Sequence, residues 1–157
     1  MVFTVAKIKA PVQAIGGLVV LPAYGFADSP AIDLLVLPGG FGTRKIMTDA
    51  ETLDWIRKVA STANKVTSVC TGSLLLAHAG LLKARRATTH WSALELLASA
   101  DASVTVEANQ RYIDDGVITS AGVAAGIDMA LYVVRELHGP EVAEDTRKYI
   151  EYPQTGT

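Results

Sequence analysis

The sequence is poor in the residues that mark several classes of protein. Its single cysteine, Cys70, cannot form a disulfide within the chain, which is typical of a protein from a reducing compartment. The three histidines, His78, His90 and His138, are far apart in the sequence, and no second cysteine accompanies the first. The ligand spacing of a zinc site is therefore absent, and we expect neither a metal ion nor a cofactor.

Positive charge is also scarce, and no hydrophobic run approaches the length of a membrane span. There are 14 lysine and arginine residues against 16 aspartate and glutamate residues, which gives a net charge of −2. The basic stripe that binds nucleic acid is missing. Residues 1–11 lack the apolar core and cleavage site of a signal peptide, and the apolar runs are much shorter than the ~20 residues that cross a bilayer. We therefore expect a cytoplasmic protein that binds neither nucleic acid nor membranes.

The sequence does contain enough apolar residues for one sizeable core. Of the 157 residues, 50% are hydrophobic and 19% are charged, which is the composition of a globular domain and not of a disordered chain. This length suits one domain and is short for two. The sequence has no internal repeat, low-complexity tract or linker, so we predict a single domain that spans residues 1–157.

Short β-branched or apolar segments alternate with amphipathic segments along the chain. The continuous apolar run 31–37 is typical of a parallel strand that is buried on both faces. We expect strands at residues 2–8, 18–21, 31–37, 65–69, 87–90, 104–106, 111–113 and 117–119. We expect helices after a capping-box pattern at 48–51, and at residues 71–80, 91–100, 120–139 and 141–150. Residues 24–30 are expected to be loop and 152–157 to be extended or frayed. This alternation predicts an α/β fold with a mostly parallel sheet.

Residues 65–72 contain the strongest functional signal in the sequence. The β-branched run 65–69 ends at Cys70, and an apolar helical pattern follows at once, with Gly72 two residues on. A strand, a sharp turn and a helix place the turn residue at the carboxyl edge of the sheet and at a helix N-terminus, where a thiolate is favoured. The same geometry with serine is called a nucleophile elbow. These residues are equally compatible with a buried structural cysteine.

Other strand ends carry residues that could act with Cys70, because ligands bind at the carboxyl ends of parallel strands. The Gly39-Gly40 turn could offer backbone N–H donors to an anion, or could be only a tight turn. His90 could serve as a base or a cation beside the thiol, or could be an ordinary surface histidine. The segment that ends at Gly122 follows a third strand. No phosphate-loop or dinucleotide-binding glycine pattern is present, so we do not expect nucleotide binding.

Four ordered blocks of the sequence resemble the ThiJ/PfpI superfamily, within the class I glutamine-amidotransferase-like fold. The blocks are 36–40 (VLPGG), 68–73 (SVCTGS), 85–91 (RRATTHW) and 122–128 (GVAAGID). They look most similar to the isocyanide hydratase branch and to the sensor domains of AraC-type regulators. The resemblance extends from Phe3 to Tyr152, and it implies a flavodoxin-like three-layer sandwich and a homodimer.

By this resemblance, Cys70 is the nucleophile. The N–H groups of Gly40 and Thr71 would form an anion pocket, and the Thr71 hydroxyl would orient substrate or water. His90 matches a histidine that lies near the cysteine in several branches. Protease-like members carry histidine directly after the nucleophile, where this chain has Thr71, so protease activity is not expected. The remaining glycines of the expected oxyanion and substrate-binding site are Gly39, Gly72 and Gly122.

The resemblance also implies that one part of the usual fold has no counterpart in this sequence. Family members usually begin with an additional strand and helix, and that helix carries an acidic residue that touches the nucleophilic thiol. This sequence begins at what resembles the second strand. We therefore expect an open edge in the sheet and a cysteine without its usual acid. Either the sequence is a truncated form of a longer product, or another subunit or a rearranged segment completes the fold.

The resemblance favours a stand-alone enzyme that hydrates an isocyanide to an N-substituted formamide. Two alternatives remain at this stage. One is a glyoxalase-like or deglycase-like enzyme that acts on α-oxoaldehydes. The other is a non-catalytic sensor or stress protein, in which Cys70 is oxidised or binds a small ligand. In each case the expected partner is a small molecule. AraC-type regulators continue into a helix-turn-helix domain, and this sequence has no such segment.

Overall fold

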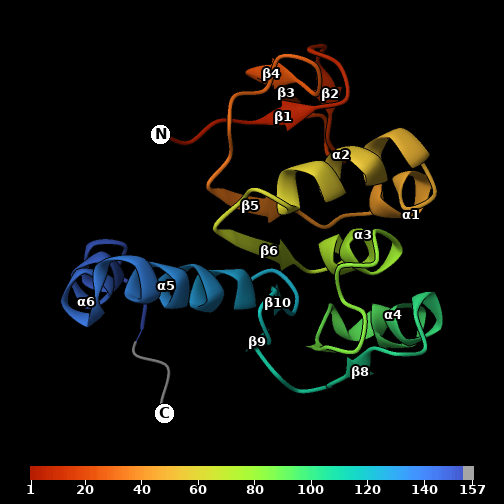
Figure 1. Cartoon of the computed structure of the whole chain (residues 1–157). Helices are drawn as coiled ribbons and strands as arrows, with labels where there is room; N and C mark the ends of the chain where they lie inside the picture. The colour runs from red at the N-terminus through yellow and green to blue at the C-terminus, as the bar shows by residue number, and fades with distance from the viewer. Residues whose placement is uncertain (154–157) are drawn as a thin grey trace.

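A four-stranded sheet lies at the centre of the computed structural model, which describes residues 1–153 (Figure 1). Its strands are β5 (Leu34–Leu37), β6 (Lys65–Val69), β10 (Ile118–Ser120) and β9 (Tyr112–Asp114), in that order across the sheet. The first three are parallel to their neighbours, and β9 runs antiparallel to β10. The α/β fold with a mostly parallel sheet is confirmed.

Three pairs of two-residue strands surround this sheet. They are β1 (Val5–Ala6) with β4 (Tyr24–Gly25), β2 (Val12–Gln13) with β3 (Val19–Val20), and β7 (Arg86–Ala87) with β8 (Thr105–Val106). The first and third pairs are parallel, and the second is an antiparallel hairpin.

Helices cover both faces of the central sheet. Figure 1 shows α2, α3 and α4 on one side and α5 and α6 on the other. The helices are α1 (Thr43–Ile46), α2 (Ala50–Ala60), α3 (Gly72–His78), α4 (Leu94–Ala100), α5 (Ala125–His138) and α6 (Pro140–Tyr149), with a 3-10 turn at Trp91–Ala93. No helix of the described chain is long and apolar enough to cross a bilayer.

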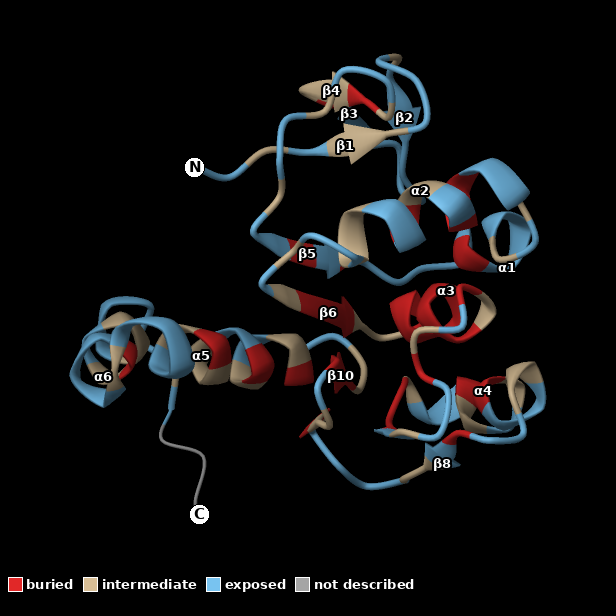
Figure 2. Cartoon of the chain, viewed as in Figure 1, coloured by how far each residue is buried: buried red, intermediate tan, exposed pale blue. Residues whose placement is uncertain are grey.

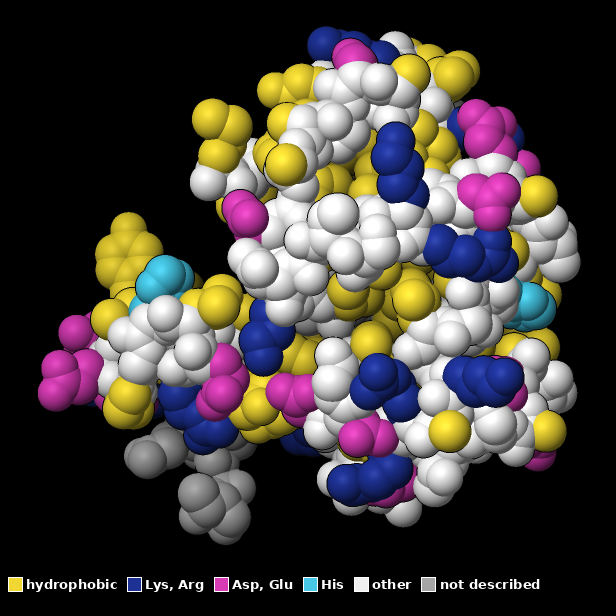
Figure 3. All heavy atoms as spheres, in the orientation of Figure 1, with side chains coloured by type: hydrophobic (Ala, Val, Ile, Leu, Met, Phe, Trp, Pro, Cys, Tyr) yellow, Lys and Arg dark blue, Asp and Glu magenta, His cyan; other side chains and the backbone are white. Residues whose placement is uncertain are grey.

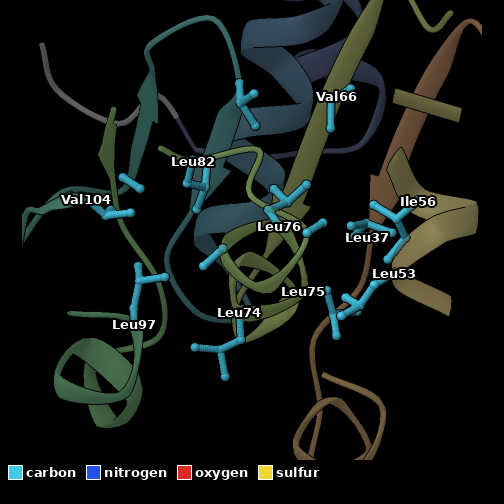
Figure 4. Packing of buried hydrophobic residues seen from close by; sticks show 14 of the residues in the cluster. Leu37, Leu53, Ile56, Val66, Leu74, Leu75, Leu76, Leu82, Leu97 and Val104 are labelled. Carbon is cyan, nitrogen blue, oxygen red and sulfur yellow. The ribbon is translucent and has the colours of Figure 1, made fainter. Parts of the chain in front are cut away.

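The main core lies between the sheet and α3, which is the most buried helix (Figure 2). Alternate residues of a strand point to opposite faces, so Leu35 and Leu37 face this core while Leu34 and Val36 face α5. Figure 4 shows the core side chains on either side of α3. Leu37, Leu53 and Ile56 lie together on one side, and Leu82, Leu97 and Val104 lie on the other.

The opposite face of the sheet is only partly covered. A groove of about 350 Å³ lies between β5, β6 and α5, and its lining is almost wholly apolar. Leu34 and Val36 border it and are 37% and 47% exposed. Within residues 1–153 no strand pairs with the outer edge of β5, since β1 and β4 pair with each other. This arrangement matches the expected open edge.

We expect Val36→Lys to reduce aggregation of this chain several-fold. An apolar edge strand with unpaired backbone groups is a template for strand addition by other molecules, and a lysine on it opposes such pairing. Light scattering over a range of protein concentrations measures the effect. Val142→Lys on α6 is the matched control, because Val142 is 46% exposed and does not line the groove beside β5. Equal effects of the two variants would show that the β5 edge has no special part in association.

Several predicted strands were wrong in their bounds. Residues 24–25 form β4 and not a loop, because Tyr24 and Gly25 pair with Val5 and Ala6. The strand predicted over 87–90 ends at Ala87. Beyond it the Thr88 N–H donates to the Thr119 hydroxyl (2.9 Å), so a side chain replaces the strand partner.

The helix predicted from residue 120 begins later. Ser120 belongs to β10, where it pairs with Val69 and Tyr112, and α5 begins at Ala125. Val123 has φ 44°, which interrupts the approach to the helix. The predicted start was wrong because the strand pairing of Ser120 depends on neighbours far away in the sequence.

The predicted frayed tail is held at its first residue. The Tyr152 hydroxyl bonds to both carboxylate oxygens of Asp128, at 3.3 and 3.2 Å, and so anchors the chain against α5. Residues 154–157 of that predicted tail lie outside the described residues.

Candidate active site

Cys70 occupies a sharp turn between a strand and a helix. Strand β6 ends at Val69, helix α3 begins at Gly72, and Cys70 between them has φ 57°. This left-handed conformation is strained for a residue with a side chain. The Cys70 N–H donates to the carbonyls of Ser120 (3.1 Å) and Ala121 (3.2 Å), which fixes the turn at the end of β10. Cys70 is partly exposed, so it is not one of the fully buried residues of the core.

Two glycines allow the neighbouring chain to approach this turn. Gly72 packs directly on the end of β5, where a methyl group on it would overlap the Leu37 carbonyl oxygen. A methyl group on Gly39 would lie 2.7 Å from the Thr71 nitrogen and 2.8 Å from both the Cys70 Cβ and the Val69 carbonyl oxygen. Gly39 therefore packs directly against the elbow, and a side chain at this position would displace one of the two segments.

Gly40 and Thr71 are joined by a hydrogen bond, whereas the sequence predicted that the N–H groups of both would form an anion pocket. The Gly40 N–H donates to the Thr71 hydroxyl oxygen (2.9 Å), so in this structure it does not face open space as an anion donor. The buried Thr71 hydroxyl in turn lies 3.1 Å from the Thr43 hydroxyl. Thr43 also donates to the Gly40 carbonyl (2.7 Å). These bonds hold the 39–43 loop against the elbow.

His90 lies against the Gly122 loop, and within residues 1–153 no hydrogen bond joins it to the Cys70 thiol. The His90 Nδ1 accepts a hydrogen bond from the Ser92 N–H (3.3 Å) and lies 2.8 Å from the Ser92 hydroxyl. Because Nδ1 is an acceptor, we assign the N–H of the imidazole ring to Nε2. A methyl group on Gly122 would overlap the imidazole Cδ2 and lie 3.1 Å from Nε2. The structure thus brings His90 and Gly122 into contact. The residue that precedes His90 forms a hydrogen bond with Cys70.

Thr89 forms this hydrogen bond with Cys70, and the sequence analysis did not assign it to the site. The buried Thr89 hydroxyl donates to the Cys70 carbonyl (2.9 Å), and the Ser73 hydroxyl donates to the same oxygen at 3.2 Å. Thr89 lies in one of the four blocks that carry the resemblance. The sequence signal for Thr43 is weaker. It is a hydroxyl residue three positions after Gly40, and this spacing is typical of a side-chain hydrogen bond to a preceding carbonyl.

No cluster of three or more histidine, cysteine, aspartate or glutamate residues that could hold a metal occurs within residues 1–153. The candidate site therefore consists of a thiol, backbone N–H groups, hydroxyl groups and one imidazole ring. The predicted lack of an acid beside the thiol stays a prediction.

We expect Gly39→Ala to change the rate of Cys70 alkylation by iodoacetamide several-fold. The added methyl group would overlap the Thr71 nitrogen, the Cys70 Cβ and the Val69 carbonyl oxygen, and so would push the loop at Gly39 away from the thiol. Mass spectrometry of the alkylated protein over time measures the rate. Gly42→Ala is the control, because a methyl group there meets nothing within 4 Å and φ is −61°. Equal alkylation rates in the two variants would show that the contact at Gly39 relaxes without moving the thiol.

A family model decides the affiliation of the chain. The model described as the DJ-1/PfpI family matches residues 1–136. The chain belongs to the DJ-1/PfpI family. The resemblance to ThiJ/PfpI proteins, including the isocyanide hydratase branch and AraC-type regulators, is thereby confirmed.

Three relatives illustrate the range of the family. Isonitrile hydratase of Pseudomonas putida is 43% identical over 152 residues, which are 96% of this chain and 65% of that protein. The HTH-type transcriptional regulator CdhR of Pseudomonas aeruginosa is 35% identical over 133 residues, or 85% of this chain and 39% of the regulator. The crystal structure of a ThiJ/PfpI family protein from Pseudomonas syringae has a TM-score of 0.89 at 38% identity, covering 98% of this chain and 64% of the other. The chain thus spans less than two thirds of the length of these relatives.

Proposed function

We propose that this DJ-1/PfpI chain hydrates isocyanides with Cys70 as the nucleophile. The observation that carries the proposal is the strained, partly exposed Cys70 at the β6–α3 turn, in a chain that is 43% identical to isonitrile hydratase. A cysteine in such a position is available for attack, whereas a structural cysteine would be packed in an unstrained conformation. We also propose that residues 1–157 act as one domain.

The proposed reaction has two steps. The Cys70 thiolate attacks the terminal isocyanide carbon, the S–C bond forms, and the same carbon takes up a proton to give a thioimidate. Water then adds to this carbon, its nitrogen is protonated, and the S–C bond breaks to release the N-substituted formamide and the thiol. The Thr71 N–H would stabilise charge that develops near the thiol, because it belongs to the residue directly after Cys70 at the start of α3. His90 is the proposed site for moving protons to and from water.

Incubation of the purified chain with benzyl isocyanide tests this proposal. We expect N-benzylformamide in the solution by chromatography, and an adduct on Cys70 of one substrate mass by intact-protein mass spectrometry. Methylglyoxal serves as the comparison substrate, because its consumption would instead indicate glyoxalase-like or deglycase-like chemistry. Absence of both formamide and adduct would reject isocyanide hydration by this chain.

A second candidate function is that of a non-catalytic sensor, because a transcriptional regulator is 35% identical over most of this chain. In that function Cys70 would only be oxidised or bind a small ligand. Mild peroxide would then add one or two oxygen atoms to Cys70, and neither isocyanide nor methylglyoxal would be consumed.

The proposed molecule is a cytoplasmic homodimer that acts on a small molecule. Support for self-association comes from the β2–β3 hairpin, where Ile15, Leu18 and Leu21 are 79%, 67% and 63% exposed. Figure 3 shows hydrophobic side chains at the surface in the region of β1 to β4, at the top of the view. Exposed apolar patches of this kind mark association surfaces. The proposed compartment rests on the single cysteine, which is typical of a protein from a reducing environment.

A further inference from the structure

A second hollow of the molecule lies beside Cys70. This cleft has a volume of about 500 Å³ and is formed by the segments 88–94, 109–111 and 121–125. Two of its wall residues bond the nucleophile's backbone, since Thr89 donates to the Cys70 carbonyl (2.9 Å) and the Ala121 carbonyl accepts the Cys70 N–H (3.2 Å). Its size is that of a site for an organic molecule.

The lining of the cleft is amphiphilic and close to neutral. Trp91 borders it with 78% of its surface exposed, and its ring lies 5.3 Å from the His90 ring. Asn109 and Gln110, which both carry side-chain amides, also line the cleft. Apart from His90, the only ionisable lining residue is Arg111, whose Nε donates to Asp128 (2.6 Å). That ion pair raises the pKa of Arg111 and leaves the cleft without an unpaired fixed charge.

Backbone strain is concentrated around this cleft. Of the five non-glycine residues with positive φ in the described chain, Cys70 (57°) adjoins the cleft, while Asn109 (61°) and Val123 (44°) line it. Positive φ is rare for a β-branched residue, and it costs free energy that a fold retains mainly at binding and catalytic sites. Val123 is 82% exposed, so burial of its side chain does not account for this conformation.

We propose that this cleft binds the substituent of the isocyanide and selects neutral, bulky groups that carry an aromatic ring or an amide. The inference rests on the proposed function, because it places the reacting carbon at Cys70 and the substituent between Trp91 and Asn109. An aromatic group packs on the exposed indole, and the Asn109 amide hydrogen-bonds a polar group. Small alkyl isocyanides reach the thiol without these contacts.

Selectivity between two substrates tests the role of Trp91. We expect Trp91→Ala to lower the ratio of kcat/KM for benzyl isocyanide to that for methyl isocyanide about tenfold, the worth of one aromatic contact. Most of the change falls on KM, since Trp91 is placed to hold the substituent and not the reacting atoms. Tyr149→Ala on α6 is the matched control, because Tyr149 is 90% exposed and distant from the cleft in the chain. An unchanged ratio in Trp91→Ala would overturn the inference.

Binding of N-benzylformamide tests the cleft without any turnover. The sequence has two tryptophans, and Trp55 stacks on Phe26, so Trp55→Phe leaves Trp91 as the only indole. We expect the ligand to quench Trp91 fluorescence, and Asn109→Gly, which tolerates the same positive φ, to raise Kd several-fold. Quenching without isocyanide turnover would reject the proposed function but keep the cleft as a ligand site. Absence of quenching, or an unchanged Kd in Asn109→Gly, would overturn the proposed binding site.

Discussion

Gly72→Ala is expected to lower the melting temperature by about 4–8 °C, or to prevent folding. A methyl group at this position would overlap the Leu37 carbonyl oxygen and lie 2.9 Å from the Leu37 carbonyl carbon. These are backbone atoms at the end of a paired strand, so they cannot move as the tip of a flexible side chain can. Overpacking of this kind costs about 3 kcal/mol, which exceeds the ~1 kcal/mol by which alanine favours a helix over glycine. For a chain of this size, each kcal/mol of destabilisation lowers the melting temperature by about 2–4 °C.

Thermal melting followed by circular dichroism measures this effect. Gly42→Ala is the control, since its methyl group would meet no atom within 4 Å and its φ of −61° suits alanine. We expect the control to melt at or slightly above the temperature of the original chain, because alanine reduces the freedom of the unfolded state. A Gly72→Ala protein that melts within a few degrees of the control would show that the contact between α3 and β5 is easily relaxed.

The parts of the fold that were predicted from the sequence are those whose signals are local. β5 and β6 are continuous apolar or β-branched runs, and α2 has an apolar stripe and a cap at its start. The Asp49 side chain caps α2 by accepting the Thr52 N–H (2.9 Å). The pKa of Asp49 is lowered to about 2, chiefly by the Thr52 hydroxyl and then by Lys7. A carboxylate at this point stays charged and stabilises the helix start.

The parts that were missed depend on pairing between distant segments. Tyr24 and Gly25 have no strand pattern of their own and become a strand only beside β1. Ser120 extends β10 because β6 and β9 lie on either side of it. Alternation of apolar residues contains no information about these neighbours. For the same reason, a two-residue strand cannot be told from a loop before the fold is known.

The candidate site shows the same division. The Cys70 turn could be predicted because the change from strand to helix is visible within a few residues. The bond between the Gly40 N–H and the Thr71 hydroxyl spans 31 positions and was not foreseen. It alters the expected anion pocket, since the Gly40 N–H is already bonded and only the Thr71 N–H is left of the two expected donors. The Thr89 contact with Cys70 likewise joins two blocks whose relative placement only the sheet determines.

Cys70→Ser is expected to reduce formamide production by at least about 100-fold while leaving the fold intact. The hydroxyl is a far weaker nucleophile than the thiol at neutral pH, and no side chain of the described site forms a hydrogen bond with the Cys70 thiol that could activate a serine in its place. Serine has nearly the shape of cysteine and bears the same strain at φ 57°, so melting should change by no more than ~2 °C. The assay is chromatographic detection of N-benzylformamide, with intact mass to show that no adduct forms on the variant.

Ser61→Ala is the control for losses of activity during purification of a variant. Ser61 is exposed at the end of α2, and its hydroxyl donates only to the Lys58 carbonyl (2.8 Å). It should keep full activity. Cys70→Ala adds a second comparison, since it removes the reacting atom altogether and should be as inactive as the serine variant. If Cys70→Ser produces formamide at an undiminished rate, the thiol is not the nucleophile. The strain at the β6–α3 turn would then need another explanation, such as packing of α3 against β5 through Gly72.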